Sequence, residues 1–218
     1  MDAVRARWSA DCRGVLPDAD TATVHEVGAD LAHRWREPHR HYHGETHLTE
    51  VLSAVDALCR AEGVGARSRG AALLAAWFHD AVYVVADPEG NERRSAEVAT
   101  DALARLGAAP ELVDRVATLV LDTAAHDLGP RVRDAARVVL HDADLWVLSA
   151  PVGRFDEYCR QVRAEYSHVP AAEYAARRTG VLRPLLARPH VYRTPHARTR
   201  WEPAARENLV RELSRLAG

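Results

Sequence analysis

The sequence predicts an all-α protein that folds as one domain. Apolar residues recur at spacings of three and four along most of the chain, the periodicity of helices that bury one face. Glycines and prolines stand between these segments, where they end one helix and begin the next. Hydrophobic residues make up 47% of the 218 residues and charged residues 28%, a balance that supports a buried core. No repeat, low-complexity segment or long linker interrupts the chain, so we expect a single domain over residues 1–218.

The individual helices follow from these signals in chain order. Asp20 or Thr21 can cap a first helix that extends to about Trp35, because Pro38 prevents its continuation. Residues 82–85 are also compatible with a short strand, although this apolar run is too short to decide. The remaining predicted helices have approximate bounds of 45–62, 68–82, 91–106, 110–125, 131–148, 151–166, 170–186 and 203–216.

Charge and cysteine content exclude several classes of function. The net charge is -2, so no general basic field exists for a nucleic-acid polymer. The combined Lys and Arg count of 29 consists of arginines alone, so any phosphate-binding cation in the chain must be Arg. The three cysteines lie far apart and favour a reducing, cytoplasmic location. The N-terminus lacks the apolar run of a signal peptide, and the most apolar stretch, residues 71–86, is too short to span a membrane comfortably.

Imidazoles and carboxylates interrupt apolar segments at three separate places. His43 and His47 are four residues apart at the start of a predicted helix, which puts them on one face. His79 and Asp80 lie within the most apolar stretch, and Asp144 lies between two further apolar runs. Burying such groups without partners costs several kcal/mol. They therefore either pair with one another and with nearby polar groups or hold a cation.

A divalent metal ion satisfies these groups together. Neutral imidazole and ionised carboxylate suit Zn, Fe or Mn, and we also consider Mg, Co and Ni, as one ion or two. A single buried histidine is more often a hydrogen-bonded core residue than a ligand. The combination of a histidine, a distant His-Asp pair and a later aspartate is much more specific. Next to Asp144, we interpret Asp142 as an exposed or capping residue.

This combination resembles the HD superfamily of metal-dependent phosphohydrolases. The matching residues are His47, His79, Asp80 and Asp144. The segment from Tyr42 to His47 resembles the Tyr-His-x-x-x-His motif of cyclic nucleotide phosphodiesterases in that superfamily, and Ala-Asp-Leu around Asp144 resembles another of their motifs. A bacterial family of predicted HD-type phosphohydrolases is more similar still, over roughly residues 38–213. Its shared segments are Arg40–His43, Trp77–Tyr83, Asn91–Ala96, Val162–Tyr166 and Trp201–Leu209.

The resemblance implies a single HD-type helical domain packed around a central metal site. The core would span about residues 38–150, with C-terminal helices from residues 151–218 packed on it. The implied metal ligands are His47, His79, Asp80 and Asp144, and Asp80 is the ligand that can bridge two ions.

The resemblance also implies an activity, the hydrolysis of a small-molecule phosphomonoester or phosphodiester, with a nucleotide as the expected substrate. Metal-activated water would attack phosphorus. Two alternatives remain open, a di-iron oxygenase and a non-catalytic metal-bound sensor or interaction domain. The oligomeric state, including a homodimer, also remains open.

Further site residues are implied by the same resemblance. His43 would act as the proton donor to the leaving oxygen, or it would only form a hydrogen bond to a carboxylate. Glu92 matches an acidic residue that orients metal-bound water or the catalytic histidine, and His126 would lie near a second metal or the substrate.

Arginines are the candidate phosphate ligands because a planar guanidinium pairs with two phosphate oxygens. The alternative is that these residues cap helix C-termini or pair with Glu165 and Glu207. For any single arginine, the structural role is the one that we favour. The arginines concerned are Arg40, Arg163, Arg178 and Arg206.

Overall fold

The computed structural model describes residues 2–88, 90–124, 128–129 and 132–218. Within these ranges the chain is all-helical and contains no strand, as the periodicity predicts. The helices, with η for short 3-10 segments, are α1 (Ala3–Val15), α2 (Thr21–Arg34), α3 (Glu45–Ala61), α4 (Ala66–Phe78), α5 (Asn91–Arg105), α6 (Pro110–Leu121), η1 (Asp122–Ala124), α7 (Ala135–Asp144), η2 (Leu145–Ser149), α8 (Val152–Glu165), α9 (Ala171–Ala187), α10 (Pro195–Arg200) and α11 (Glu202–Ala217).

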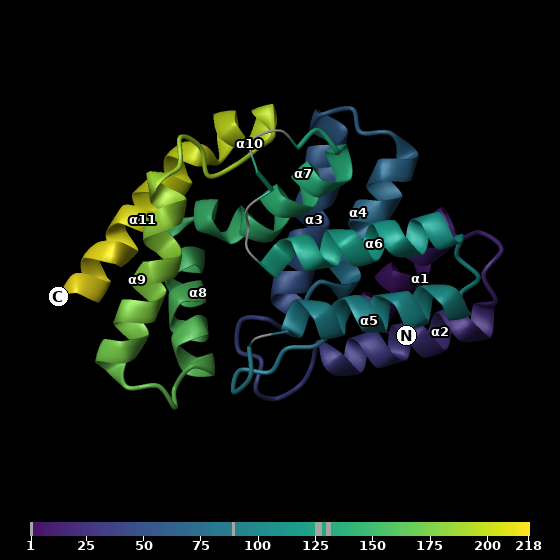
Figure 1. Cartoon of the computed structure of the whole chain (residues 1–218), viewed down its shortest axis with the longest axis horizontal. Helices are drawn as coiled ribbons and strands as arrows, with labels where there is room; N and C mark the ends of the chain where they lie inside the picture. Colours follow the sequence, from purple (N-terminus) through teal and green to yellow (C-terminus); the bar gives the residue numbers. More distant parts are fainter. Residues whose placement is uncertain (1, 89, 125–127, 130–131) are drawn as a thin grey trace.

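One hydrophobic core connects the two ends of the chain. In Figure 1, α1, α2, α5 and α6 lie on one side, α8, α9 and α11 on the other, and α3 and α7 between them. A continuous cluster of buried side chains runs from Trp8 in α1 to Leu209 in α11. The buried cluster therefore includes side chains of α1 and α2, which precede residue 38. Among the described residues, no helix combines the length and apolar character needed to cross a bilayer.

The first helix, α1, is not predicted from the sequence because only a narrow part of its surface is apolar. Its contribution is concentrated in Trp8 and Cys12, which are both fully buried. The Trp8 indole donates a hydrogen bond to the Val24 carbonyl (2.9 Å), and its ring packs edge-on against Trp77. A Cβ on Gly28 would lie 2.4 Å from the Trp8 ring, so α1 and α2 can approach this closely only at a glycine.

Helix α4 ends at Phe78, four residues before the predicted limit, so His79 and Asp80 directly follow the helix instead of lying inside it. Residues 70–78 are all buried, as expected for a core helix. The segment that was compatible with a strand is a loop instead. Its backbone groups bond to α5 side chains, since the Val82 amide donates to the Ser95 hydroxyl (3.0 Å) and the Val84 amide to Asn91 Oδ1 (3.1 Å).

Helix α7 is shorter than the predicted 131–148. Asp134 caps its first turn by accepting from the amides of Ala136 (2.8 Å) and Arg137 (3.2 Å). After Asp144 the chain tightens into the 3-10 segment η2. Asp144 is therefore the last α-helical residue before this change of geometry.

Asp142 is not exposed, in contrast to one of the two roles suggested by the sequence. Its side chain is fully buried and accepts hydrogen bonds from the amides of Arg193 (2.8 Å) and Thr194 (2.7 Å) and from the Thr194 hydroxyl (2.7 Å). His141 Nδ1 lies 2.9 Å from the same carboxylate. Asp142 thus fixes the start of α10, a six-residue helix that is too short for sequence periodicity to reveal.

We expect Asp142→Asn to destabilise the fold by about 3 kcal/mol, because an amide cannot accept all of these bonds and two backbone donors, that of Thr194 buried, depend on them. The free energy of unfolding is measured by urea denaturation. The control is Asp114→Asn on exposed α6 surface, which should change it by less than about 0.5 kcal/mol. Equal stability of the two variants would contradict the role of Asp142.

Candidate metal centre

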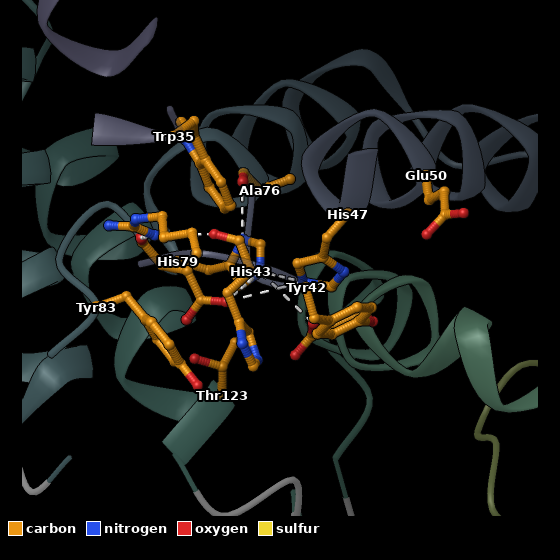
Figure 2. Close-up of polar contacts among 12 residues, drawn as sticks. Trp35, Tyr42, His43, His47, Glu50, Ala76, His79, Tyr83 and Thr123 are labelled. Atoms are coloured by element: carbon orange, nitrogen blue, oxygen red, sulfur yellow. Dashed lines mark hydrogen bonds and ion pairs between the residues drawn. The ribbon is translucent and has the colours of Figure 1, made fainter. Parts of the chain in front are cut away.

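Three helix ends bring the predicted metal ligands together. His47 lies in the first turn of α3, His79 and Asp80 directly follow α4, and Asp144 ends α7. His47 and His79 are 2% and 1% exposed. Figure 2 shows their imidazoles close together, with His43 beside them. Residues almost a hundred positions apart in the sequence thus share one small region.

The distances between the ligand atoms suit a metal ion. His47 Nε2 and His79 Nε2 are 3.1 Å apart, and Asp80 Oδ2 lies 3.3 Å from His79 Nε2 and 3.8 Å from His47 Nε2. Two ligands bound at about 2.1 Å lie roughly 3.0 Å apart at right angles and roughly 3.4 Å apart in a tetrahedron. These three residues can therefore hold a metal ion.

Asp144 lies beside this group of three, close to both imidazoles. Its Oδ1 lies 3.3 Å from His47 Nε2 and 3.5 Å from His79 Nε2. These separations equal those expected between neighbouring ligands of one ion. The donor set of two imidazoles and two carboxylates is one that Zn, Fe and Mn accept.

Surrounding groups hold the two imidazoles in place. His79 Nδ1 lies 2.8 Å from the Ala76 carbonyl, which can only accept, so this nitrogen carries hydrogen and the neutral ring presents the Nε2 lone pair to the site. The Trp35 ring packs on His79 and the Tyr42 ring on His47, with centroid distances of 5.4 and 4.7 Å. The apolar neighbours exclude water from one side of the centre.

The electrostatics of the metal-free centre also indicate a place for a cation. Burial alone would lower the pKa of His79, but the carboxylates of Asp80 and Asp144 outweigh burial and raise this pKa to about 9. Burial lowers the pKa of His47, helped by the charge of His79. Burial would raise the pKa of Asp80, but the charge of His79 holds it well below its usual range. A proton on His79 therefore balances the carboxylates, and a bound metal ion would replace it.

Arg40 supports this centre through backbone groups and does not line the cavity that contains Asp80. Its guanidinium is fully buried and donates to Glu37 (2.8 Å) and to the carbonyls of His43 (3.1 Å), Asp80 (2.7 Å) and Ala81 (3.2 Å). Four of its five N–H groups are engaged in this way. These bonds fit the structural alternative, in which Arg40 fixes the backbone that carries Asp80.

His43 is paired with a buried glutamate that the sequence analysis assigned no role in the site. His43 Nδ1 lies 2.8 Å from Glu165 Oε2, while Oε1 accepts from the backbone amides of Tyr42 (2.7 Å) and His43 (2.9 Å). Tyr83 donates to Oε2 (3.1 Å), and its ring stacks on His43 at 4.1 Å. Burial would raise the pKa of Glu165, but these hydrogen bonds lower it, so Glu165 is an anion that orients His43.

Glu165 lies within Val162–Tyr166, one of the segments that resemble the bacterial family. This resemblance was the signal in the sequence that could have pointed to Glu165. The sequence could not show its partner, because 122 residues separate it from His43. For Glu92, the expected role was to orient either water or the catalytic histidine; the carboxylate that contacts His43 is that of Glu165. Glu92 does line the same pocket, and burial and the nearby charges of Asp80 and Asp144 raise its pKa.

The other predicted residues separate into two groups. Arg163 caps the end of α8 by donating to the carbonyls of Tyr166 and Val169 (3.0 Å for the latter), which is the structural alternative. Arg206 likewise donates to the carbonyls of residues 186, 188 and 189. Arg178, by contrast, lines the pocket. His126 lies outside the described residues.

A cavity of about 240 Å³ opens onto the centre. One end is formed by His47, Asp80 and Asp144, together with His43 and Glu92. The rest is mostly apolar and aromatic and comes largely from η2, α8 and α9. This part includes Leu145, Val147, Leu148, Tyr158, Val162, Tyr166, Val181, Leu182 and Leu185.

Comparison of the chain with protein-family models, with curated proteins and with solved structures found no match in any of the three. The resemblance to HD phosphohydrolases therefore rests on the motif residues of the sequence. The structure adds that His47, His79 and Asp80 form a group able to hold a metal ion.

Proposed function

We propose that this chain is a metal-dependent phosphohydrolase of the HD type, which cleaves a phosphate ester with water. The observation that carries the proposal is the meeting of two imidazoles and two carboxylates, from His47, His79, Asp80 and Asp144, at one end of a cavity that also contains His43. The cofactor would be a divalent ion such as Zn, Fe or Mn, given this donor set.

The charges in the cavity make a cation necessary for this function. Asp80, Asp144 and Glu92 surround the reactive end, and a phosphate dianion would be repelled by them. A divalent ion reverses this charge, polarises a phosphoryl oxygen and lowers the pKa of water. Without such an ion, the same carboxylates would exclude the substrate.

His43 is placed to donate a proton during cleavage. Its Nδ1 is engaged with Glu165, so Nε2 is the nitrogen left to give a proton to another group. As water oxygen bonds to phosphorus and the ester P–O bond breaks, the leaving oxygen takes this proton. Glu165 stabilises the imidazolium that supplies it, and Tyr83 keeps the ring in position.

Metal removal should lower the melting temperature of the protein, because an ion bound only by the folded state stabilises that state. At a metal concentration about 100 times the Kd, the loss on chelation corresponds to roughly 5–10 °C for a chain of this size. Differential scanning calorimetry after metal analysis measures it. An unchanged melting temperature after verified removal would contradict the metal centre.

The variant Asp80→Asn should lose most of this stabilisation and lower metal-dependent hydrolysis of p-nitrophenyl phosphate at least about a hundredfold, because it removes a ligand charge. Asp101→Asn, on the exposed face of α5, is the matched control and should behave as the wild type. Undiminished hydrolysis by Asp80→Asn would argue against the proposed function. Oxygen consumption with two bound irons would instead indicate the oxygenase alternative.

Replacing His43 should impair poor leaving groups most, because p-nitrophenolate leaves without a proton while an alkoxide or phenolate needs one. For His43→Gln we expect kcat to fall by about 10²–10⁴ with phenyl phosphate and by clearly less with p-nitrophenyl phosphate. The exposed neighbour His41→Gln is the control. Steady-state kinetics with both esters measures the difference.

Glu165→Gln should show the same dependence on the leaving group in weaker form, because it removes the carboxylate that holds His43 Nδ1 and orients the ring. A merely structural role for Glu165 would lower both rates by one factor. Equal losses for the two esters in both variants would rule out proton donation by His43.

A further inference from the structure

Arg178 is a half-buried cation without a carboxylate partner among the described residues. It lies on α9 and lines the cavity that opens onto the candidate metal centre. Its Nη2 donates to the Tyr158 hydroxyl, while its Nε is shielded from solvent and has no acceptor. A partly desolvated guanidinium with no anion beside it is a favourable place for negative charge, so its position on a cavity wall points to an anion that enters from outside.

Arg178 differs in this respect from the other candidate arginines. Arg40, Arg163 and Arg206 donate to backbone carbonyls and are engaged in holding the fold together. Among the described residues that line the cavity, Arg178 is the one arginine. A ligand with an anionic group can therefore find its cation on the protein only there.

Arg178 lies away from the metal ligands, at the other end of an aromatic wall. Its polar neighbours are Tyr158, Tyr174 and Cys159, and none of them is a candidate metal ligand. Its guanidinium lies 4.9 Å from the Tyr158 ring, which packs at 4.5 Å on Tyr42, which in turn packs at 4.7 Å on His47. Two rings thus separate the guanidinium from the metal centre.

We propose that Arg178 binds a carboxylate at the end of the substrate farthest from phosphorus, so that the preferred substrates are compact phosphate monoesters with a largely apolar body and a terminal carboxylate. A carboxylate matches the planar guanidinium with two parallel bonds. Leu182 and Leu185, about one and two turns further along α9, are buried and would contact the apolar body. This inference rests on the proposed function for the phosphoryl end.

The cavity argues against a nucleoside di- or triphosphate. Its volume of about 240 Å³ is below the range of roughly 300–1,000 Å³ typical of sites for larger ligands. Additional phosphates would lie against apolar side chains or near Asp80 and Glu92, with Arg178 as the one guanidinium available. Among the nucleotides expected from the sequence, the di- and triphosphates therefore fit this cavity poorly.

Two phosphonates that cannot be hydrolysed test the proposal on the metal-loaded protein. Phenylphosphonate carries the phosphoryl end alone, and 4-carboxyphenylphosphonate adds the carboxylate. Isothermal titration calorimetry should give a Kd about tenfold or more lower for the second, since a paired, charge-assisted contact is gained. Arg178→Met should bring the ratio of the two Kd values close to one. The control is Arg177→Met, an exposed neighbour that pairs with Glu173, and it should keep the wild-type ratio.

The outcomes separate the two proposals. Equal binding of both phosphonates to the wild type would overturn the carboxylate site and leave the proposed function standing, whereas binding of neither would overturn both. Equal weakening of both in Arg178→Met would assign Arg178 to the phosphoryl group and also overturn the inference. If Arg178→Met does not fold, the ratio of the two Kd values in the wild type still tests the carboxylate site. Arg178→Lys should then give a smaller ratio than the wild type, because an ammonium cannot form the paired bonds.

Discussion

The burial of two carboxylates beside two imidazoles is the constraint on which this structure depends. Asp80 and Asp144 have lost most of their water, so positive charge must lie next to them. These carboxylates outweigh burial and raise the pKa of His79 to about 9, so without a metal ion a proton on this imidazole would supply that charge. A divalent ion would supply it more fully, because it could bond to both nitrogens and to the neighbouring carboxylates. Under the proposed function, folding and metal binding would then be coupled through the same few atoms.

The fold meets this constraint by placing each ligand at a helix end. A helix end leaves backbone groups that need partners, and in this chain buried side chains provide them. Arg40 binds the carbonyl of Asp80 itself, so one guanidinium fixes the ligand's backbone. Asp142, two residues before Asp144, ties α7 to the start of α10. The centre is therefore held by charged residues that never contact the cavity, which explains why several candidate site residues have structural roles.

The sequence allowed the prediction of those site residues whose surroundings are local. His47, His79 and Asp80 stand out because their own neighbours in the sequence are apolar, and the helices around them follow from periodicity. The role of Glu165 could not be predicted, since an acidic residue in an amphipathic helix looks like ordinary surface until the fold brings it against His43. The same holds for Asp142, whose partners lie about fifty residues away. Long-range pairing of buried charges depends on tertiary structure, which periodicity does not encode.

The distribution of charge along the cavity connects the metal centre with substrate choice. Without a cation, the cavity is acidic at the end of Asp80 and Asp144 and basic at the end of Arg178, so it would suit a ligand with opposite charges at its two ends. A bound divalent ion would reverse the sign of the first end and leave the second unchanged. Both ends would then attract anions, while the wall between them, with Leu182 and Leu185, stays apolar. A monoester with only its phosphoryl group charged would satisfy the metal end and leave Arg178 uncompensated, so under the proposal the metal ion and Arg178 together would favour a substrate with two anionic ends.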